Sequence, residues 1–126
     1  MNYKVKNLFK ATDDRGTLIE LLRSDESGTF NQIYTANIKP GCFRGGHYHK
    51  ERKEWFCVIQ GQGTYKIRDI KTGEEKKIDV CGEDFIQIEL PPYNWHQITN
   101  TGKKDLIFVS AISDCYSKNN PDTFRE

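Results

Sequence analysis

The sequence predicts an all-β sandwich or barrel formed by a single domain of residues 1–126. Short segments rich in β-branched and aromatic residues recur along the chain, and turn-forming residues separate them. Two segments, TYKIRDI (64–70) and FIQIEL (85–90), alternate apolar and polar residues with the period of a half-buried strand. Because no segment combines a helical period with helix-capping residues, the sequence predicts no helix.

The predicted strands follow one another at the short intervals typical of a sandwich or barrel, each before a turn signal. A polar tail, SKNNPDTFRE (117–126), is expected to lie over the surface. In chain order the predicted strands are LIELL (18–22), FNQIYTANI (30–38), EWFCVI (54–59), TYKIRDI (64–70), KKIDV (76–80), FIQIEL (85–90), WHQIT (95–99) and DLIFVSAI (105–112).

Composition narrows the range of partners and compartments. The formal net charge is +1, which gives no support for binding to nucleic acid or to an anionic membrane. The charged N-terminus lacks the apolar region of a signal peptide, and no apolar run is long enough for a membrane span. We therefore expect a cytoplasmic location. The four cysteines form no CxxC pair, so reduced thiols are expected.

All three histidines of the chain lie in two segments that can meet at one point. His47 and His49 are two residues apart, so on a strand both imidazoles lie on the same face. Glu54 has an odd offset from His49, but a turn at the charged KERK (50–53) would let it return from the next strand. His96 follows PPYNW at the start of another strand.

Three imidazoles and one carboxylate form a ligand set suited to a divalent transition metal. We predict that His47, His49, Glu54 and His96 bind one such ion, with zinc as the first expectation. Nickel, manganese and iron are the alternatives, and copper is also compatible with these donors. The competing interpretation is that the histidines are solvated or satisfied core residues.

The same residues resemble the two cupin signatures. The first, G-x5-H-x-H-x4-E-x6-G, is matched at every specified position from Gly41 to Gly61. The second, G-x5-P-x-G-x2-H-x3-N, is matched by Pro91, His96 and Asn100, whereas Tyr93 replaces a glycine. The resemblance implies a cupin double-stranded β-helix, a jelly-roll barrel. Some cupins use this pocket without a metal.

A second resemblance covers nearly the whole chain. DDRGTLIE, then F-x-Q at 30–32, then FRGGHYH resemble the dTDP-4-keto-6-deoxyhexose 3,5-epimerases in residue type and order. The chain is more similar to the C-terminal cupin domain of capsule-synthesis UDP-2-acetamido-2,6-dideoxy-hexulose reductases, which share a tail like NPDTF (120–124). FRGGHYHK also resembles the corresponding segment of the 3,4-ketoisomerases. These resemblances imply an epimerase or isomerase acting on a nucleotide-linked 4-keto-6-deoxy sugar in capsule or O-antigen synthesis.

The epimerase resemblance also implies roles for individual residues. Arg15 and Glu20 match positions that contact the nucleotide, and Gln32 and Arg44 match positions near the sugar and diphosphate. Arg44 lies at an odd offset from His47, and the intervening Gly-Gly is expected to form a bulge that brings both into one cavity.

His47 also matches the catalytic base of the epimerases. A nitrogen that binds a metal has no free lone pair for a proton, so His47 is either ligand or base through that atom. The epimerases carry a tyrosine, their general acid, at the position where this chain has Ser110. The general acid of this chain is therefore unassigned. The candidate donors are Tyr34, Tyr48, Tyr65 and Tyr93.

Two further expectations concern partners and alternatives. EWFCVI is apolar on both faces, so its outward face needs a cover, and together with the epimerase resemblance this predicts a homodimer. The alternatives to a sugar-nucleotide isomerase are a non-catalytic nucleotide-sugar-binding cupin and a metal-dependent dioxygenase. The sequence leaves open the sugar, the nucleotide base, the native metal and the stereochemical outcome.

Overall fold

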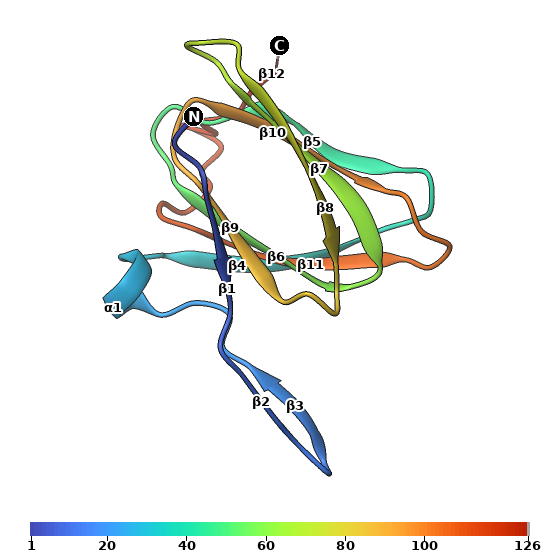
Figure 1. The fold of residues 1–126 in the computed structure, drawn as a ribbon. Helices are drawn as coiled ribbons and strands as arrows, with labels where there is room; N and C mark the ends of the chain where they lie inside the picture. The colour runs from blue at the N-terminus through green and yellow to red at the C-terminus, as the bar shows by residue number, and fades with distance from the viewer. Residues whose placement is uncertain (126) are drawn as a thin grey trace.

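The computed structural model describes residues 1–125 and consists almost entirely of antiparallel strands in two facing sheets (Figure 1). The order in the first sheet is β1 (Lys4–Asn7), β9 (Ile86–Leu90), β6 (Glu54–Gln60), β11 (Leu106–Ile112) and β4 (Gln32–Ile38). The order in the second sheet is β12 (Phe124–Arg125), β5 (Phe43–Tyr48), β10 (Asn94–Asn100), β7 (Gln62–Asp69) and β8 (Glu75–Cys81).

Apart from the β7–β8 hairpin, neighbours in each sheet are distant in sequence, as in a jelly roll, and the predicted cupin fold is confirmed. Side chains along β7 and β10 alternate between buried and partly exposed positions, so one face of each strand points between the sheets. The core contains residues of both sheets: Ile38, Phe56, Val58, Ile88, Leu90, Leu106 and Phe108 from the first, and Tyr65, Ile67, Val80 and Ile98 from the second.

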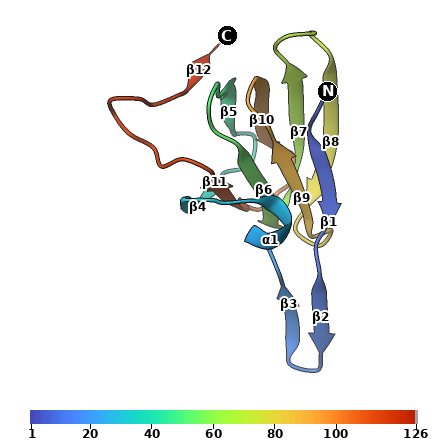
Figure 2. The ribbon, with the colours of Figure 1, turned by 90° about the vertical axis from the view of Figure 1, so that its left-hand side faces the viewer.

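A hairpin of β2 (Lys10–Asp13) and β3 (Gly16–Ile19) projects away from the barrel (Figures 1 and 2). The predicted strand 18–22 therefore ends early, at Ile19. SDESG, predicted as a turn, forms one turn of helix, α1 (Ser24–Ser27), which is the only helix within residues 1–125. In that range no helix has the length and apolar character needed to cross a membrane.

The outward face of β6 is covered by the chain itself. Trp55 and Cys57 are each only 3% exposed. Leu21 and Leu22, which follow the hairpin, border the same shallow depression as these two side chains, and the Leu21 carbonyl accepts a hydrogen bond from Gln87. The argument that β6 needs a second subunit as its cover was therefore wrong. The homodimer itself stays a prediction.

The glycine positions of the second cupin signature keep a glycine-like backbone. With Pro91 as the proline of the signature, the first glycine position is Phe85 and the second is Tyr93. Both residues have positive φ angles, of 49° and 67°. The Tyr93 amide donates to the His49 carbonyl at 2.7 Å, which fixes the turn that begins β10. The turn geometry that leads to His96 is thus retained although neither glycine is present.

Candidate functional site

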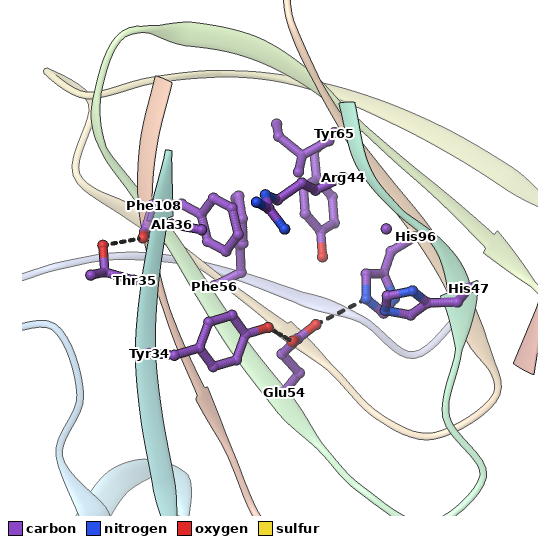
Figure 3. Close-up of a pocket in the computed structure, with 12 residues that line it drawn as sticks. Tyr34, Thr35, Ala36, Arg44, His47, Glu54, Phe56, Tyr65, His96 and Phe108 are labelled. Carbon is purple, nitrogen blue, oxygen red and sulfur yellow. Dashed lines mark hydrogen bonds and ion pairs between the residues drawn. The ribbon is translucent and has the colours of Figure 1, made fainter. Parts of the chain in front are cut away.

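A pocket of about 360 Å³ lies between the two sheets (Figure 3). Strands β4, β6 and β11 form one side, and β5, β7 and β10 form the other. The lining residues are Tyr34, Thr35, Ala36, Arg44, Gly45, His47, Glu54, Phe56, Tyr65, His96, Ile98 and Phe108.

A bulge in β5 places His47 directly opposite His96. The pairing of β5 with β10 shifts between His96 and Gln97, because Gly46 is the extra residue on β5. Gly45 has a φ of 91°, and a Cβ there would approach the His96 carbonyl oxygen to 2.7 Å, so only glycine fits. Arg44 and His47 both line the pocket, which confirms the bulge predicted from the Gly-Gly pair.

Three imidazoles converge at this pocket: His47 and His96 line it, and His49 lies beside them. His47, His49 and His96 offer ligand atoms that all lie within 4.8 Å of one another, and their ring centroids are 4.9 to 5.5 Å apart. The Nδ1 atoms of His49 and His96 donate to the carbonyls of Asp122 and Asn94, at 2.6 and 3.0 Å. Each of these two rings is therefore oriented by the backbone, which leaves Nε2 as the atom directed at the cluster.

Glu54 reaches the cluster from the opposite sheet. Its Oε2 is 3.0 Å from Nε2 of His96, and Tyr34 donates to Oε1 at 2.9 Å (Figure 3). Glu54 is outside the group of three histidines whose ligand atoms lie within 4.8 Å. The turn at 50–53 returns the chain to β6 as expected, so all four predicted ligands come from the predicted segments.

The electrostatics of the cluster favour neutral His47 and His49 beside an ion pair of His96 with the Glu54 carboxylate. Burial and the neighbouring histidines lower the pKa of His47 to about 3, and burial also lowers the pKa of His49. Burial alone would raise the pKa of Glu54, but His96 and the Tyr34 hydroxyl lower it to about 2. Burial would lower the pKa of His96, but Glu54 raises it.

These protonation states fit the requirements of a divalent cation. Metal binding needs deprotonated ligands, and neutral His47 and His49 with an anionic Glu54 satisfy this condition, whereas His96, paired with Glu54, would release a proton when a cation binds. The Nδ1 of His47 is buried and has no hydrogen-bond partner within the described residues. An unpaired buried nitrogen beside two oriented imidazoles is a donor arrangement that a metal would satisfy.

A C-terminal segment supports the histidine turn and was missed from the sequence. Asp122 is 5% exposed, and its carboxylate accepts hydrogen bonds from the amides of Lys50, Glu51 and Arg52. The Asp122 carbonyl orients His49. The tail expected on the surface is therefore partly buried, and the available signal was the NPDTF (120–124) tail of the resemblance.

Three of the predicted substrate residues do not line the pocket. Arg15 lies at the tip of the projecting hairpin, where its 87% exposed side chain pairs with Asp13. Glu20 lies 3.4 Å from the Arg23 guanidinium at the base of the hairpin. Gln32 begins β4, and its side-chain oxygen accepts a hydrogen bond from the Tyr116 amide.

The strand beside Ser110 carries a tyrosine, although position 110 itself does not. Ser110 is 1% exposed and donates to the Trp55 carbonyl, so its hydroxyl is engaged in the wall of the barrel. Tyr34 pairs directly with Ser110 across β4 and β11, and its hydroxyl extends into the pocket to Glu54. A tyrosine hydroxyl is therefore present in the pocket although position 110 carries none.

The comparisons with known proteins agree with this architecture. Residues 11–124 match the family model of the polysaccharide biosynthesis C-terminal domain. The chain is 39% identical over 113 residues to the UDP-2-acetamido-2,6-beta-L-arabino-hexul-4-ose reductase of Pseudomonas aeruginosa, covering 90% of this chain and 30% of that protein. It is 31% identical over 129 residues to the spore coat polysaccharide biosynthesis protein SpsL of Bacillus subtilis, covering 97% and 85% of the two chains.

A solved structure extends the agreement to three dimensions. A 3,4-ketoisomerase from Helicobacter canadensis superposes with a TM-score of 0.85 at 26% identity, covering 100% of this chain and 92% of that one. The family match over residues 11–124 and the similarity to SpsL agree with the resemblance found in the sequence. The chain is therefore a cupin that belongs to the polysaccharide biosynthesis C-terminal domain family.

Proposed function

We propose that this chain is a metal-containing epimerase or isomerase that acts on a nucleotide-linked 4-keto-6-deoxy sugar during polysaccharide biosynthesis. The observation that carries the proposal is a pocket lined by Arg44, Glu54 and two imidazoles of a three-histidine cluster. Cation ligands beside an arginine suit a substrate with a ketone at one end and a diphosphate at the other.

The size of the pocket decides which part of the substrate it can hold. A volume of about 360 Å³ is near the lower end of the ~300–1,000 Å³ range of small-molecule pockets. The sugar would occupy this volume, and the diphosphate would lie at the mouth, where Arg44 is exposed. The Arg44 guanidinium can bind a diphosphate through paired charge-assisted hydrogen bonds.

The reaction class is proton exchange at the carbon next to the ketone. The ketone acidifies this C–H bond, a base removes the proton, and the enolate is protonated again on the other face or at another atom. A metal held by His47, His49, Glu54 and His96 would supply Lewis-acid stabilisation of the enolate oxygen. The neutral state of His47 suits a ligand, whereas its low pKa makes it a weak base.

The relatives support the substrate class. By its name, the Pseudomonas relative acts on a UDP-linked acetamido-dideoxy hexulose, and this chain spans 30% of its length. The Helicobacter structure is a 3,4-ketoisomerase, which also acts next to a sugar ketone. Epimerisation and ketoisomerisation share the enolate step, so both remain within the proposal.

Exchange with solvent deuterium tests the proposed function. The metal-loaded protein is incubated with UDP- and dTDP-4-keto-6-deoxy sugars in deuterium oxide, and the deuterium position is read by NMR. We expect deuterium at the carbon next to the ketone, with His96→Ala inactive and metal-free. Oxygen uptake with no deuterium incorporation would support the dioxygenase, and nucleotide-sugar binding with neither would support the non-catalytic cupin.

The same experiment assigns His47. If His47 is a metal ligand, His47→Ala loses both metal and exchange. If His47 is the base, His47→Ala keeps its metal and loses exchange alone. Elemental analysis of the variant beside the NMR measurement separates the two roles.

The proposal includes a homodimer. Arg15 lies on a hairpin directed away from the barrel, so it can reach a nucleotide only in the pocket of a second copy (Figure 2). The hairpin and β4 also expose apolar side chains, with Leu18 60% and Ile33 57% accessible. Light scattering at micromolar concentration tests the dimer, and a monomer would contradict it.

A further inference from the structure

Tyr65 is a buried tyrosine whose ring is held rigidly in the wall of the pocket. It lies on β7, between Ile98 on β10 and Ile78 on β8. Its ring is stacked parallel to His96, with centroids 6.1 Å apart, and packs against Phe56 at 4.5 Å. The residue is 1% exposed, so the direction of its hydroxyl is fixed by packing.

The hydroxyl has no hydrogen-bond partner in the part of the chain that the structure describes. Figure 3 shows it pointing into the pocket, on the side of Glu54 and His96. Tyr34 lines the same pocket but donates to Glu54. Buried hydroxyls in native proteins are nearly always paired, so an unpaired hydroxyl in a pocket wall indicates a missing partner, either a ligand atom or a buried water.

Neighbouring groups leave the Tyr65 hydroxyl available as a donor. Tyr34 contacts one oxygen of Glu54 and His96 contacts the other, and the Tyr65 hydroxyl forms no hydrogen bond to either oxygen. A tyrosine phenol carries its proton at neutral pH, as a hydrogen-bond donor must.

We propose that the Tyr65 hydroxyl donates a hydrogen bond to the ketone oxygen of the bound sugar and stabilises the enolate that forms from it. The inference rests on the proposed function and assigns a catalytic residue that the sequence left open among four tyrosines. A base takes the proton from the carbon next to the ketone, and the C–H electrons form the C=C bond. The carbonyl π electrons move to the oxygen, where Tyr65 donates without losing its proton, and reprotonation of carbon restores the ketone.

Tyr65→Phe tests the proposal because it removes only the oxygen atom. We expect the variant to fold with its metal content unchanged and with a melting temperature equal to or above that of the wild type. An unpaired buried hydroxyl is unfavourable in the ligand-free protein, so its removal should not destabilise the fold. Deuterium exchange should fall by about 100-fold, the usual loss for one oxyanion donor, with a smaller change in nucleotide-sugar affinity.

Two further variants separate the outcomes. Tyr3→Phe removes a hydroxyl from a partly buried tyrosine outside the pocket and should change neither exchange nor melting temperature. Tyr34→Phe deprives Glu54 of a donor and should lower metal affinity, which Tyr65→Phe should not. Wild-type exchange that persists in Tyr65→Phe would overturn the inference about Tyr65 and leave the proposed function standing.

The remaining outcomes are equally decisive. A lower melting temperature with unchanged exchange would show that the hydroxyl bonds a buried water and has only a structural role, which overturns the inference. If the wild type binds no nucleotide sugar and exchanges no proton, the proposed function fails, and the role of Tyr65 on a ketone fails with it.

Discussion

The barrel pocket and the projecting hairpin both carry residues predicted to bind the substrate, but only the pocket brings such residues together. In the pocket, residues from two sheets converge: His47, His96 and Arg44 from one sheet and Glu54 from the other. On the hairpin, Arg15 donates hydrogen bonds to Asp13, two residues away. A buried, close-packed interior fixes the directions of side chains, whereas an exposed two-stranded hairpin is marginal by itself and gains a defined role only against another surface.

The largest effect is expected from the histidine cluster. His49→Ala should lower metal affinity by more than about 100-fold, since a chelate that loses one protein ligand loses much of its binding free energy. Zinc titration and elemental analysis measure the effect. Chelator treatment should lower the melting temperature of the wild type and leave that of the variant unchanged. Equal zinc affinity in both proteins would contradict the predicted ligand set.

The C-terminal support should give the next largest effect. Asp122→Ala removes the acceptor for three amides of the 50–52 turn and should destabilise the fold by about 2–4 kcal/mol. Because this turn carries His49, metal affinity should also fall by about 10–100-fold. Asp122→Asn is the matched control, since it keeps one acceptor oxygen, and it should lose less of both. Denaturant unfolding and zinc titration check the two effects separately.

Arg44 tests whether substrate binding and metal binding in the pocket depend on different residues. Arg44→Ala should weaken nucleotide-sugar binding by about tenfold or more, because a diphosphate loses its paired charge-assisted hydrogen bonds. The metal content should not change, since Arg44 is not among the clustered ligands. Calorimetry with UDP- and dTDP-sugars measures the affinity. Arg44→Lys is the control: it restores the charge without the fork and should recover only part of the binding.

The next prediction tests whether Arg15 on the hairpin contributes to the pocket of a second subunit. If a partner's hairpin completes the pocket, Arg15→Ala should weaken nucleotide-sugar binding by less than about tenfold and change stability by under ~0.5 kcal/mol. Mixing the Arg15→Ala and Arg44→Ala proteins should then restore binding in one pocket of each heterodimer. That pocket has Arg44 from the Arg15→Ala subunit and receives Arg15 from the hairpin of the Arg44→Ala subunit. No restoration, or a monomeric wild type, would leave Arg15 as a surface residue.

The smallest effect concerns Cys57, on the covered outer face of β6. Burial raises the pKa of this thiol to about 11. Its neutral form therefore contributes stability that is present below pH 9 and is lost as the pH rises through about 11. At about pH 8.5 an alkylating reagent should modify the exposed Cys42 well before Cys57. Mass spectrometry of the labelled peptides checks the order.

Strands with a strong local pattern were predicted well, and weakly patterned segments were not. WHQIT and DLIFVSAI became β10 and β11 within one residue at each end. In contrast, β1 and β2 carry lysines and expose every residue, so their pairing comes from a sheet edge and a hairpin partner and not from local hydrophobicity. The SDESG segment has no apolar residues, so no hydrophobic periodicity predicted the helical turn that it forms.

The sequence alone determined the cupin fold, the bulge at Gly45 and Gly46, and the gathering of His47, His49, Glu54 and His96. The bulge and the shared face of His47 and His49 depend on residue type and short spacing, which strand period and glycine geometry convert into direction. The place of His96 beside them follows from the resemblance to the cupin signatures. Only the tertiary structure decided that Asp122 supports His49 from 73 residues away, and that Glu54 is shared between Tyr34 and His96. Only the tertiary structure shows that Tyr65, one of the four candidate donors, lies buried in the pocket wall and that its hydroxyl has no hydrogen-bond partner within residues 1–125. Such contacts join strands distant in the chain, and local spacing carries no information about which of their side chains meet.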